Sequence, residues 1–213
     1  MYLTEVFLLD VPKISDDQFN NLLMFVSPDR AARVQRLKSR DKQSQSLFAK
    51  LLLRAVLCDR LKVQNSELEF AVSEKGKPYL KNCTGVHFSI SHTDSLVAVA
   101  LSNSEVGVDV EAVRPLKHNG YTKFLTPDEQ AYIGADSTTT KQRFFEVWTK
   151  KEAYFKRFGE GVGAKAASVS VLDEPTVKTA FSNEAVLSVC CDGQFELVEV
   201  SEAKRILQSF LNV

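Results

Sequence analysis

The strongest constraint on the fold is a short alternating segment, residues 106–111, which reads Val-Gly-Val-Asp-Val-Glu. Successive side chains of a β-strand point to opposite faces, so the valines share one face while Gly107, Asp109 and Glu111 share the other. Two carboxylates on a strand suited to burial repel each other and lose hydration unless a cation lies between them. Their hard oxygen ligands suit Mg²⁺, whereas an edge strand with its polar face in water would need no ion. The segment alone leaves both interpretations open.

A second motif surrounds Trp148, where apolar residues recur with helical spacing. Phe144, Trp148 and Phe155 form one stripe, and Glu152 falls on it, four residues after Trp148. A carboxylate among large aromatic side chains requires a partner for its charge. The simplest candidate is Lys156, one helical turn further on, in an i,i+4 pair.

The order of expected elements recurs along the chain and predicts an α+β fold. A polar, turn-like stretch at residues 102–105 is the best candidate boundary. We therefore expect two similar α/β subdomains, 1–104 and 105–213, in a pseudo-twofold arrangement with the active site in the cleft between them. The expected strands are 2–9, 67–72, 86–91, 96–101, 106–111, 167–172, 185–191 and 195–200. Three expected helices begin near residues 15, 28 and 127. A further helix ends at about residue 61, and two more span about 140–158 and 202–211.

The charge of the chain is balanced overall but unevenly distributed. Residues 28–62 hold ten basic and three acidic side chains, although the formal net charge of all 213 residues is zero. This excess suits a phosphate-rich partner or, alternatively, a solvated helix face. The four cysteines show no metal-site spacing and favour reduced thiols in the cytoplasm. No apolar run approaches the length of a membrane span, and residues 1–10 are typical of a core strand and not of a signal peptide.

Three motifs in series resemble those of the 4′-phosphopantetheinyl transferases. They are residues 88–93 (Phe-Ser-Ile-Ser-His-Thr), residues 107–111 and residues 148–156, in this order and at these separations. The chain is similar, over nearly its whole length, to the long monomeric type that activates peptide and polyketide synthases. The resemblance implies Mg²⁺-dependent transfer of 4′-phosphopantetheine from coenzyme A to a serine of an apo acyl or peptidyl carrier protein. It implies neither a nucleic-acid nor a membrane partner.

The resemblance also implies roles for individual residues. Lys156 would neutralise the pyrophosphate of coenzyme A, and Glu152, or a water that it orients, would accept the serine proton. The expected Mg²⁺ ligands are Asp109, Glu111 and Glu152. The residues expected to hold the 3′-phosphate are Arg30, Arg33, Lys77, Ser91 and His92.

The chain departs from the family pattern at Thr93-Asp94, and at Gln45, where many relatives carry arginine. Glu129 matches a further acidic position of the family, but it also completes a helix capping box with Thr126, which we favour as its role. Two rival functions remain. The basic segment 28–62 could serve a nucleic-acid-binding domain, whose binding would be salt-sensitive and metal-free. Alternatively, the carboxylates could serve a metal-dependent phosphoesterase that uses water as the acceptor.

Overall fold

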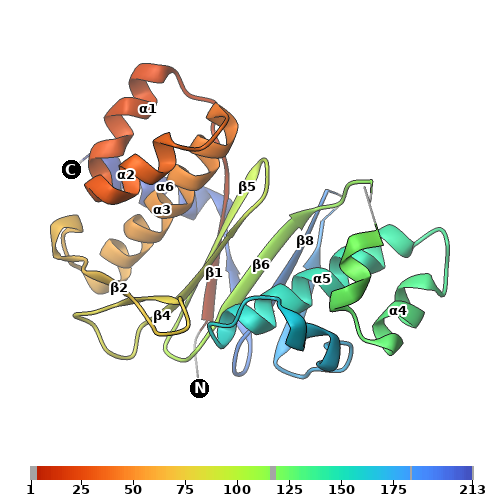
Figure 1. Ribbon diagram of the computed structural model, residues 1–213. Coiled ribbons are helices and arrows are strands. Elements are labelled where there is room, and N and C mark those ends of the chain that lie inside the picture. The colour runs from red at the N-terminus through yellow and green to blue at the C-terminus, as the bar shows by residue number, and fades with distance from the viewer. Residues whose placement is uncertain (1–3, 116–118, 183, 213) are drawn as a thin grey trace.

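The computed structural model describes residues 4–115, 119–182 and 184–212, and it is a mixed α+β protein. Two β-sheets lie together in the centre, with α1, α2, α3 and α6 on one side and α4 and α5 on the other (Figure 1). The strands are β1 Thr4–Asp10, β2 Phe70–Val72, β3 Pro78–Leu80, β4 His87–His92, β5 Leu96–Ser102, β6 Gly107–Ala112, β7 Val177–Phe181, β8 Ala185–Cys190 and β9 Phe195–Val198.

The helices follow the start signals in the sequence. Ser15 caps α1 with a capping box formed with Gln18, where the sequence predicts a helix start, and Pro28 is the first residue of α2. The α-helices are α1 Asp16–Leu22, α2 Pro28–Gln35, α3 Arg40–Leu61, α4 Pro127–Gly134, α5 Thr140–Arg157 and α6 Val200–Leu211. The 3₁₀ turns are η1 Leu23–Phe25, η2 Asn65–Glu67, η3 Asn119–Phe124 and η4 Ala164–Ser168. Within the described parts of the chain, no helix is long and apolar enough to cross a membrane.

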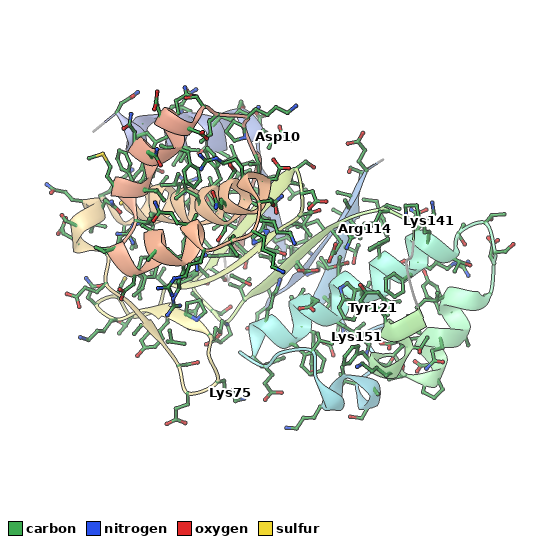
Figure 2. The ribbon with its side chains drawn as sticks, turned by 45° about the horizontal axis from the view of Figure 1, so that its top comes forward. Asp10, Lys75, Arg114, Tyr121, Lys141 and Lys151 are labelled. Atoms are coloured by element: carbon green, nitrogen blue, oxygen red, sulfur yellow. The ribbon has the colours of Figure 1, made fainter. Side chains whose placement is uncertain are left out.

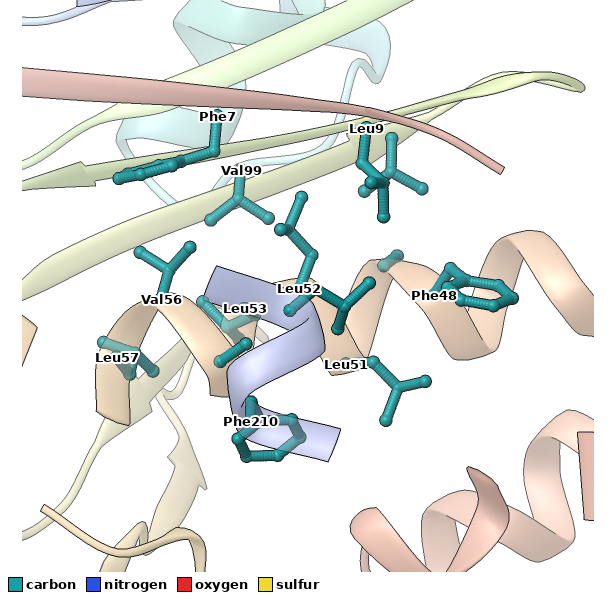
Figure 3. Close-up of a cluster of buried hydrophobic side chains, with 14 of the residues drawn as sticks. Phe7, Leu9, Phe48, Leu51, Leu52, Leu53, Val56, Leu57, Val99 and Phe210 are labelled. Atoms are coloured by element: carbon teal, nitrogen blue, oxygen red, sulfur yellow. The ribbon is translucent and has the colours of Figure 1, made fainter. Parts of the chain in front are cut away.

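The first sheet has the strand order β4-β5-β1-β9, and α3 covers one of its faces. Alternation along β1 turns Phe7 and Leu9 towards α3, where they meet Leu52 and other leucines (Figure 3). Almost every residue of α3 from 44 to 57 is buried, because β5, α2 and α6 enclose this helix. Burying each large aliphatic side chain contributes about 1.5–3 kcal/mol, so this core is the main stabilising body of the molecule.

The second sheet has the order β6-β8-β7 and is antiparallel throughout. Val108 and its neighbours Val106 and Val110 face away from α5 and pack against Val6 and Ala98 of the first sheet. Gly107, Asp109 and Glu111 therefore lie on the face towards α5, as the alternating sequence predicts. The arrangement is four layers: helices, first sheet, second sheet, helices.

Gly107 permits an unusually close contact between β6 and α5. A Cβ atom at this position would lie 1.9 Å from the carbonyl oxygen of Ala153 and 2.6 Å from the amide nitrogen of Arg157. No side chain fits such a space, because real Cβ atoms essentially never approach other heavy atoms within 3.0 Å. The glycine thus brings the end of α5 directly onto the strand that carries Asp109.

The predicted strand at 167–172 is wrong. Its place is taken by η4 and an irregular stretch whose backbone groups bond to side chains. The carbonyl oxygens of Ala166 and Val169 accept hydrogen bonds from Lys151 at 2.7 and 2.6 Å, and the amide of Val171 donates to Glu129 at 3.0 Å. Because buried backbone groups need only some partner, these side chains replace a strand ladder. The predicted strand 67–72 is also shortened to β2, since η2 occupies its first residue, and β3 was not predicted.

The last two elements return to the first sheet. Strand β9 pairs in parallel with β1, and α6 packs on α3 through Ile206, Leu207 and Phe210. Through these contacts β9 and α6 join the first sheet and the core around α3. The physical reason is that β1 offers an unpaired edge and that the apolar face of α6 requires cover.

Candidate active site

The candidate site forms where β4 of the first sheet meets β6 of the second. The amide of Val108 donates to the hydroxyl of Ser89 at 3.0 Å, so a side chain continues the hydrogen bonding between the sheets. Further along the same two strands, the hydroxyl of Ser91 donates to Oδ1 of Asp109 at 2.7 Å. Although β6 is an edge strand of its sheet, Asp109 is only 4% exposed, so this carboxylate does not lie in water as the alternative interpretation requires.

Helix α5 places Lys156 on the same carboxylate. Nζ of Lys156 lies 2.6 Å from Oδ1 of Asp109 and donates to the hydroxyl of Ser91 at 3.2 Å. The alternative of a simple i,i+4 pair with Glu152 is therefore not what forms: within the described residues, Glu152 makes neither a hydrogen bond nor an ion pair. Asp109 is the more deeply buried acid, and leaving a buried charge unpaired is costly, so the lysine turns towards the strand.

The carboxylate cluster, defined here as Asp109, Glu111 and Glu152, carries more negative charge than its basic partners neutralise. Oδ2 of Asp109 is buried and has no hydrogen-bond partner in the described structure. Burial raises the pKa of Glu152, and the nearby charge of Asp109 raises it further. Burial likewise raises the pKa of Glu111, although this carboxylate accepts a hydrogen bond from Arg114 at 2.8 Å. An additional cation would relieve all three acids.

The described residues include no set of three or more His, Cys, Asp or Glu side chains already positioned to hold a metal ion. Mg²⁺, however, typically takes only one or two carboxylates, with waters and substrate phosphates completing its shell. The orphaned oxygen of Asp109 and the unpaired carboxylate of Glu152 meet that requirement. The donor set therefore fits an ion that binds together with a phosphorylated substrate, and not a closed structural site.

A second cluster, here called the cationic pocket, is a cavity of about 500 Å³ lined by Arg30, Arg33, Lys50 and Arg54. Arg30 donates to Ser46 at 3.1 Å, but its buried Nε has no hydrogen-bond partner in the described parts of the chain. Burial lowers the pKa of Arg30, and the charge of Arg33 lowers it further. The structure thus brings together Arg30 and Arg33 as the sequence predicts, and it adds Lys50, which sequence reasoning had counted only among the basic residues of a helix.

Charged groups of both clusters act on the imidazole of His92. Partial burial lowers its pKa, followed by the charges of Lys156, Arg30 and Lys50. The turn that follows is fixed by Gln45, whose buried amide donates to the carbonyl oxygen of Asp94 at 3.2 Å. A neutral side chain therefore holds the loop after His92.

Two predicted phosphate ligands have other contacts. Ser91 bonds to Asp109 and Lys156 within the carboxylate cluster. Lys77 donates to the carbonyl oxygens of Arg157 and Val106, at 2.6 and 3.2 Å, and also pairs with Glu105. These bonds use all three donors of the Lys77 ammonium group and do not include any residue of the cationic pocket.

Glu129 has the structural role that the capping motif indicates. It completes the capping box of α4, and both of its oxygens have partners: the amides of Thr126 and Val171, and the ammonium of Lys151 at 2.9 Å. Figure 2 shows Lys151 in the lobe of α4 and α5, together with Arg114 and Tyr121. A carboxylate with every partner satisfied has no free oxygen for a substrate or metal ion.

Comparisons with known proteins identify the family of this chain. Residues 105–202 match the family model of the 4′-phosphopantetheinyl transferase superfamily. Residues 13–104 match a model described as 4′-phosphopantetheinyl transferase, N-terminal. Among similar curated proteins, the 4′-phosphopantetheinyl transferase gsp of Aneurinibacillus migulanus is 31% identical over 160 residues, which cover 74% of this chain and 67% of the relative.

Two further relatives show the same relationship at lower identity. The 4′-phosphopantetheinyl transferase Sfp of Bacillus subtilis is 24% identical over 159 residues, covering 74% of this chain and 71% of the relative. The 4′-phosphopantetheinyl transferase HetI of a Nostoc species is 29% identical over 175 residues, covering 79% and 72%. With its three motifs gathered at the junction of the two sheets, the chain belongs to the 4′-phosphopantetheinyl transferase superfamily and is an enzyme of that family.

Proposed function

We propose that the enzyme transfers the 4′-phosphopantetheine group of coenzyme A to a serine of an apo acyl or peptidyl carrier protein, releasing adenosine 3′,5′-bisphosphate. The observation that carries this proposal is the pairing of two sites of opposite charge. The carboxylate cluster provides ligands for Mg²⁺ on a pyrophosphate, and the cationic pocket accepts a separate phosphate. Coenzyme A has both groups, a pyrophosphate and a 3′-phosphate on its adenosine.

In the bound complex, Arg30, Arg33 and His92 receive the 3′-phosphate. Phe70 and Pro78 line the same pocket and offer an apolar wall to the adenine ring. Ser91 contributes a further contact to this phosphate from the boundary between the two clusters. A phosphate contact by Lys77 requires its ammonium to leave the carbonyl oxygens that it now occupies.

For the reaction, Asp109, Glu111 and Glu152 would hold Mg²⁺, which when bound neutralises charge on the pyrophosphate. Lys156 turns from Asp109 to a pyrophosphate oxygen and stabilises the charge that develops there. The serine oxygen bonds to the β-phosphorus as the bond from phosphorus to the leaving adenosine 3′,5′-bisphosphate breaks. Glu152 accepts the serine proton, a role suited to a carboxylate whose pKa burial has raised.

The remaining features of the proposal concern the whole molecule. The two lobes are related by a pseudo-twofold axis in which α3 on the first sheet corresponds to α5 on the second. This is supported by the long helix that each lobe packs across a small sheet. The enzyme is a cytoplasmic monomer without a nucleic-acid or membrane partner, in keeping with four free cysteines.

One assay tests the function: coenzyme A, Mg²⁺ and a panel of apo carrier proteins, read as a mass gain on the carrier. We expect the gain of one phosphopantetheine group per carrier serine, and none with the carrier serine replaced by alanine. Hydrolysis of coenzyme A without any carrier modification would establish the phosphoesterase instead. Metal-free, salt-sensitive nucleic-acid binding without transfer would establish the third alternative.

A further inference from the structure

Lys50 lies midway along α3 and lines the cationic pocket beside Arg30 and Arg33. Its side chain makes no hydrogen bond and no ion pair with any residue that the structure describes. Arg54, one helical turn further on, lines the same pocket but is held in place by Asn65, to which it donates at 2.5 and 2.8 Å. Lys50 is therefore a half-buried cation whose charge the described protein leaves uncompensated.

The surroundings of Lys50 disfavour its charge. Burial lowers the pKa of Lys50 to about 8, and the charge of Arg30 acts in the same direction. Arg30 adds a buried Nε without an acceptor. The acidic side chain that lines this pocket is Asp29, which is exposed and does not pair with either cation. Cations gathered in this way repel one another unless an anion binds among them.

We propose that Lys50 binds the 3′-phosphate of coenzyme A and thereby makes the enzyme select coenzyme A over dephospho-coenzyme A. This inference rests on the proposed function and adds a residue of α3 to its phosphate site. A phosphate monoester dianion presents three acceptor oxygens, enough for the ammonium of Lys50, the guanidinium of Arg30 and the imidazole of His92. The charges of Lys50 and Arg30 already act together on His92.

A structural role for Lys50 makes a different prediction. Its aliphatic stem lines the pocket beside Leu53 and Val26, and a residue that served only to cover them would not distinguish the two coenzymes. The variant Lys50→Met keeps the apolar stem and removes only the charge, while Lys50→Arg keeps the charge. Lys42→Met is the matched control, since Lys42 is an exposed lysine on the first turn of the same helix.

The first measurement is kcat/KM for coenzyme A and for dephospho-coenzyme A with one apo carrier protein. We expect Lys50→Met to lose about tenfold or more with coenzyme A and less than about twofold with dephospho-coenzyme A, the difference being one charge-assisted bond. Lys50→Arg should retain the preference, and Lys42→Met should match the unmodified enzyme. Equal losses on the two donors, or no loss, would overturn the assignment of Lys50.

The second measurement needs no carrier protein and no metal. Calorimetry in buffers of different ionisation enthalpy reports the protons taken up when adenosine 3′,5′-bisphosphate binds. At about pH 8, near the pKa of free Lys50, binding should take up roughly half a proton, because the phosphate holds the lysine charged. Adenosine 5′-monophosphate should cause little uptake, and Lys50→Met should abolish it. Uptake that persists in Lys50→Met would contradict the proposal.

The two measurements separate this inference from the proposed function. An enzyme that binds the bisphosphate with Lys50-dependent proton uptake but modifies no carrier would support the phosphate contact and refute the transfer reaction. Transfer that proceeds with an unchanged donor preference in Lys50→Met would support the function and refute the role of Lys50.

Discussion

Two lysines of α5, five residues apart, form ion pairs of opposite character. Lys151 and Glu129 are both fully buried, and every donor and acceptor of the pair has a partner. Lys156 pairs with Asp109 where β4 meets β6, but Oδ2 of Asp109 has no partner among the residues that the structure describes. Both pairs have short contacts, 2.9 and 2.6 Å, so distance does not distinguish them.

The two ion pairs differ in how completely their polar atoms are hydrogen-bonded. The pair of Lys151 and Glu129 joins α5 to the start of α4 and to the irregular stretch after η4, and each oxygen of Glu129 and the ammonium of Lys151 has a partner. Within the described part of the chain, the pair of Lys156 and Asp109 retains a free acceptor, beside an unpaired Glu152. Saturated polar networks fix a fold, whereas unsaturated ones are available to a ligand. Five predictions test this contrast, from the largest expected effect to the smallest.

Lys151→Met should lower the free energy of unfolding by about 3–5 kcal/mol, because it leaves Glu129 charged, buried and unpaired. Urea denaturation followed by circular dichroism measures this loss. The double variant Lys151→Met with Glu129→Gln should recover part of it, since the orphaned charge is then absent. A loss below about 1 kcal/mol in the single variant would show that the pair does not hold this lobe together.

Asp109→Asn should reduce kcat/KM by roughly 10²-fold or more while the protein remains folded. Asparagine retains the size of the side chain and an oxygen for the hydroxyl of Ser91, but it removes the charge that Lys156 and a metal ion require. Steady-state kinetics with an apo carrier protein give the rate, and thermal denaturation checks the fold. Normal turnover in this variant would exclude Asp109 from the reaction.

Glu152→Gln and Lys156→Met should each lower turnover, but they should respond differently to Mg²⁺. Increasing Mg²⁺ should restore part of the rate of Glu152→Gln if weakened metal binding causes its defect, by about tenfold at most. It should not restore Lys156→Met, whose missing charge acts directly on the pyrophosphate. A Mg²⁺ titration of both variants makes the comparison, and identical responses would remove the distinction between their roles.

Stability should depend on pH through the carboxylate cluster. The pKa values of Glu111 and Glu152 are raised in the folded protein, so the folded state binds more protons than the unfolded state just above the ordinary glutamate pKa of 4.5. The free energy of unfolding without metal should therefore fall as the pH rises through this window. Glu152→Gln should weaken that dependence. Denaturation curves at several pH values check the sign, and a rise with pH from these residues would contradict it.

Lys77→Ala should have the smallest effect on donor preference. Because its ammonium is held by two carbonyl oxygens and Glu105, its loss should affect coenzyme A and dephospho-coenzyme A alike, within about twofold. The same kinetic assay that tests Lys50→Met provides the comparison. A selective loss with coenzyme A would instead show that Lys77 leaves these contacts and reaches the 3′-phosphate, as the family resemblance predicts.

Much of the fold and part of the site follow from local patterns. The alternation at 106–111 placed Asp109 and Glu111 on one face, because the side-chain period of a strand is fixed. The capping motifs at Ser15 and Thr126 marked two helix starts for the same kind of reason: a local hydrogen bond depends only on residues three apart. Arg30 and Arg33 share one side of α2 for the same kind of reason, because they lie three residues apart.

Only the tertiary structure decided which partners those residues take. Lys156 pairs with Asp109 and not with Glu152 because Gly107 allows α5 to contact β6. This contact joins residues about 50 positions apart in the sequence. Lys50 lines the cationic pocket because α3 and the short strands β2 and β3 together enclose that pocket. Strand β9 crossed to the first sheet because β1 had a free edge. Spacing and capping depend on neighbouring residues, but burial and charge pairing depend on packing between distant segments, and no local pattern encodes that packing.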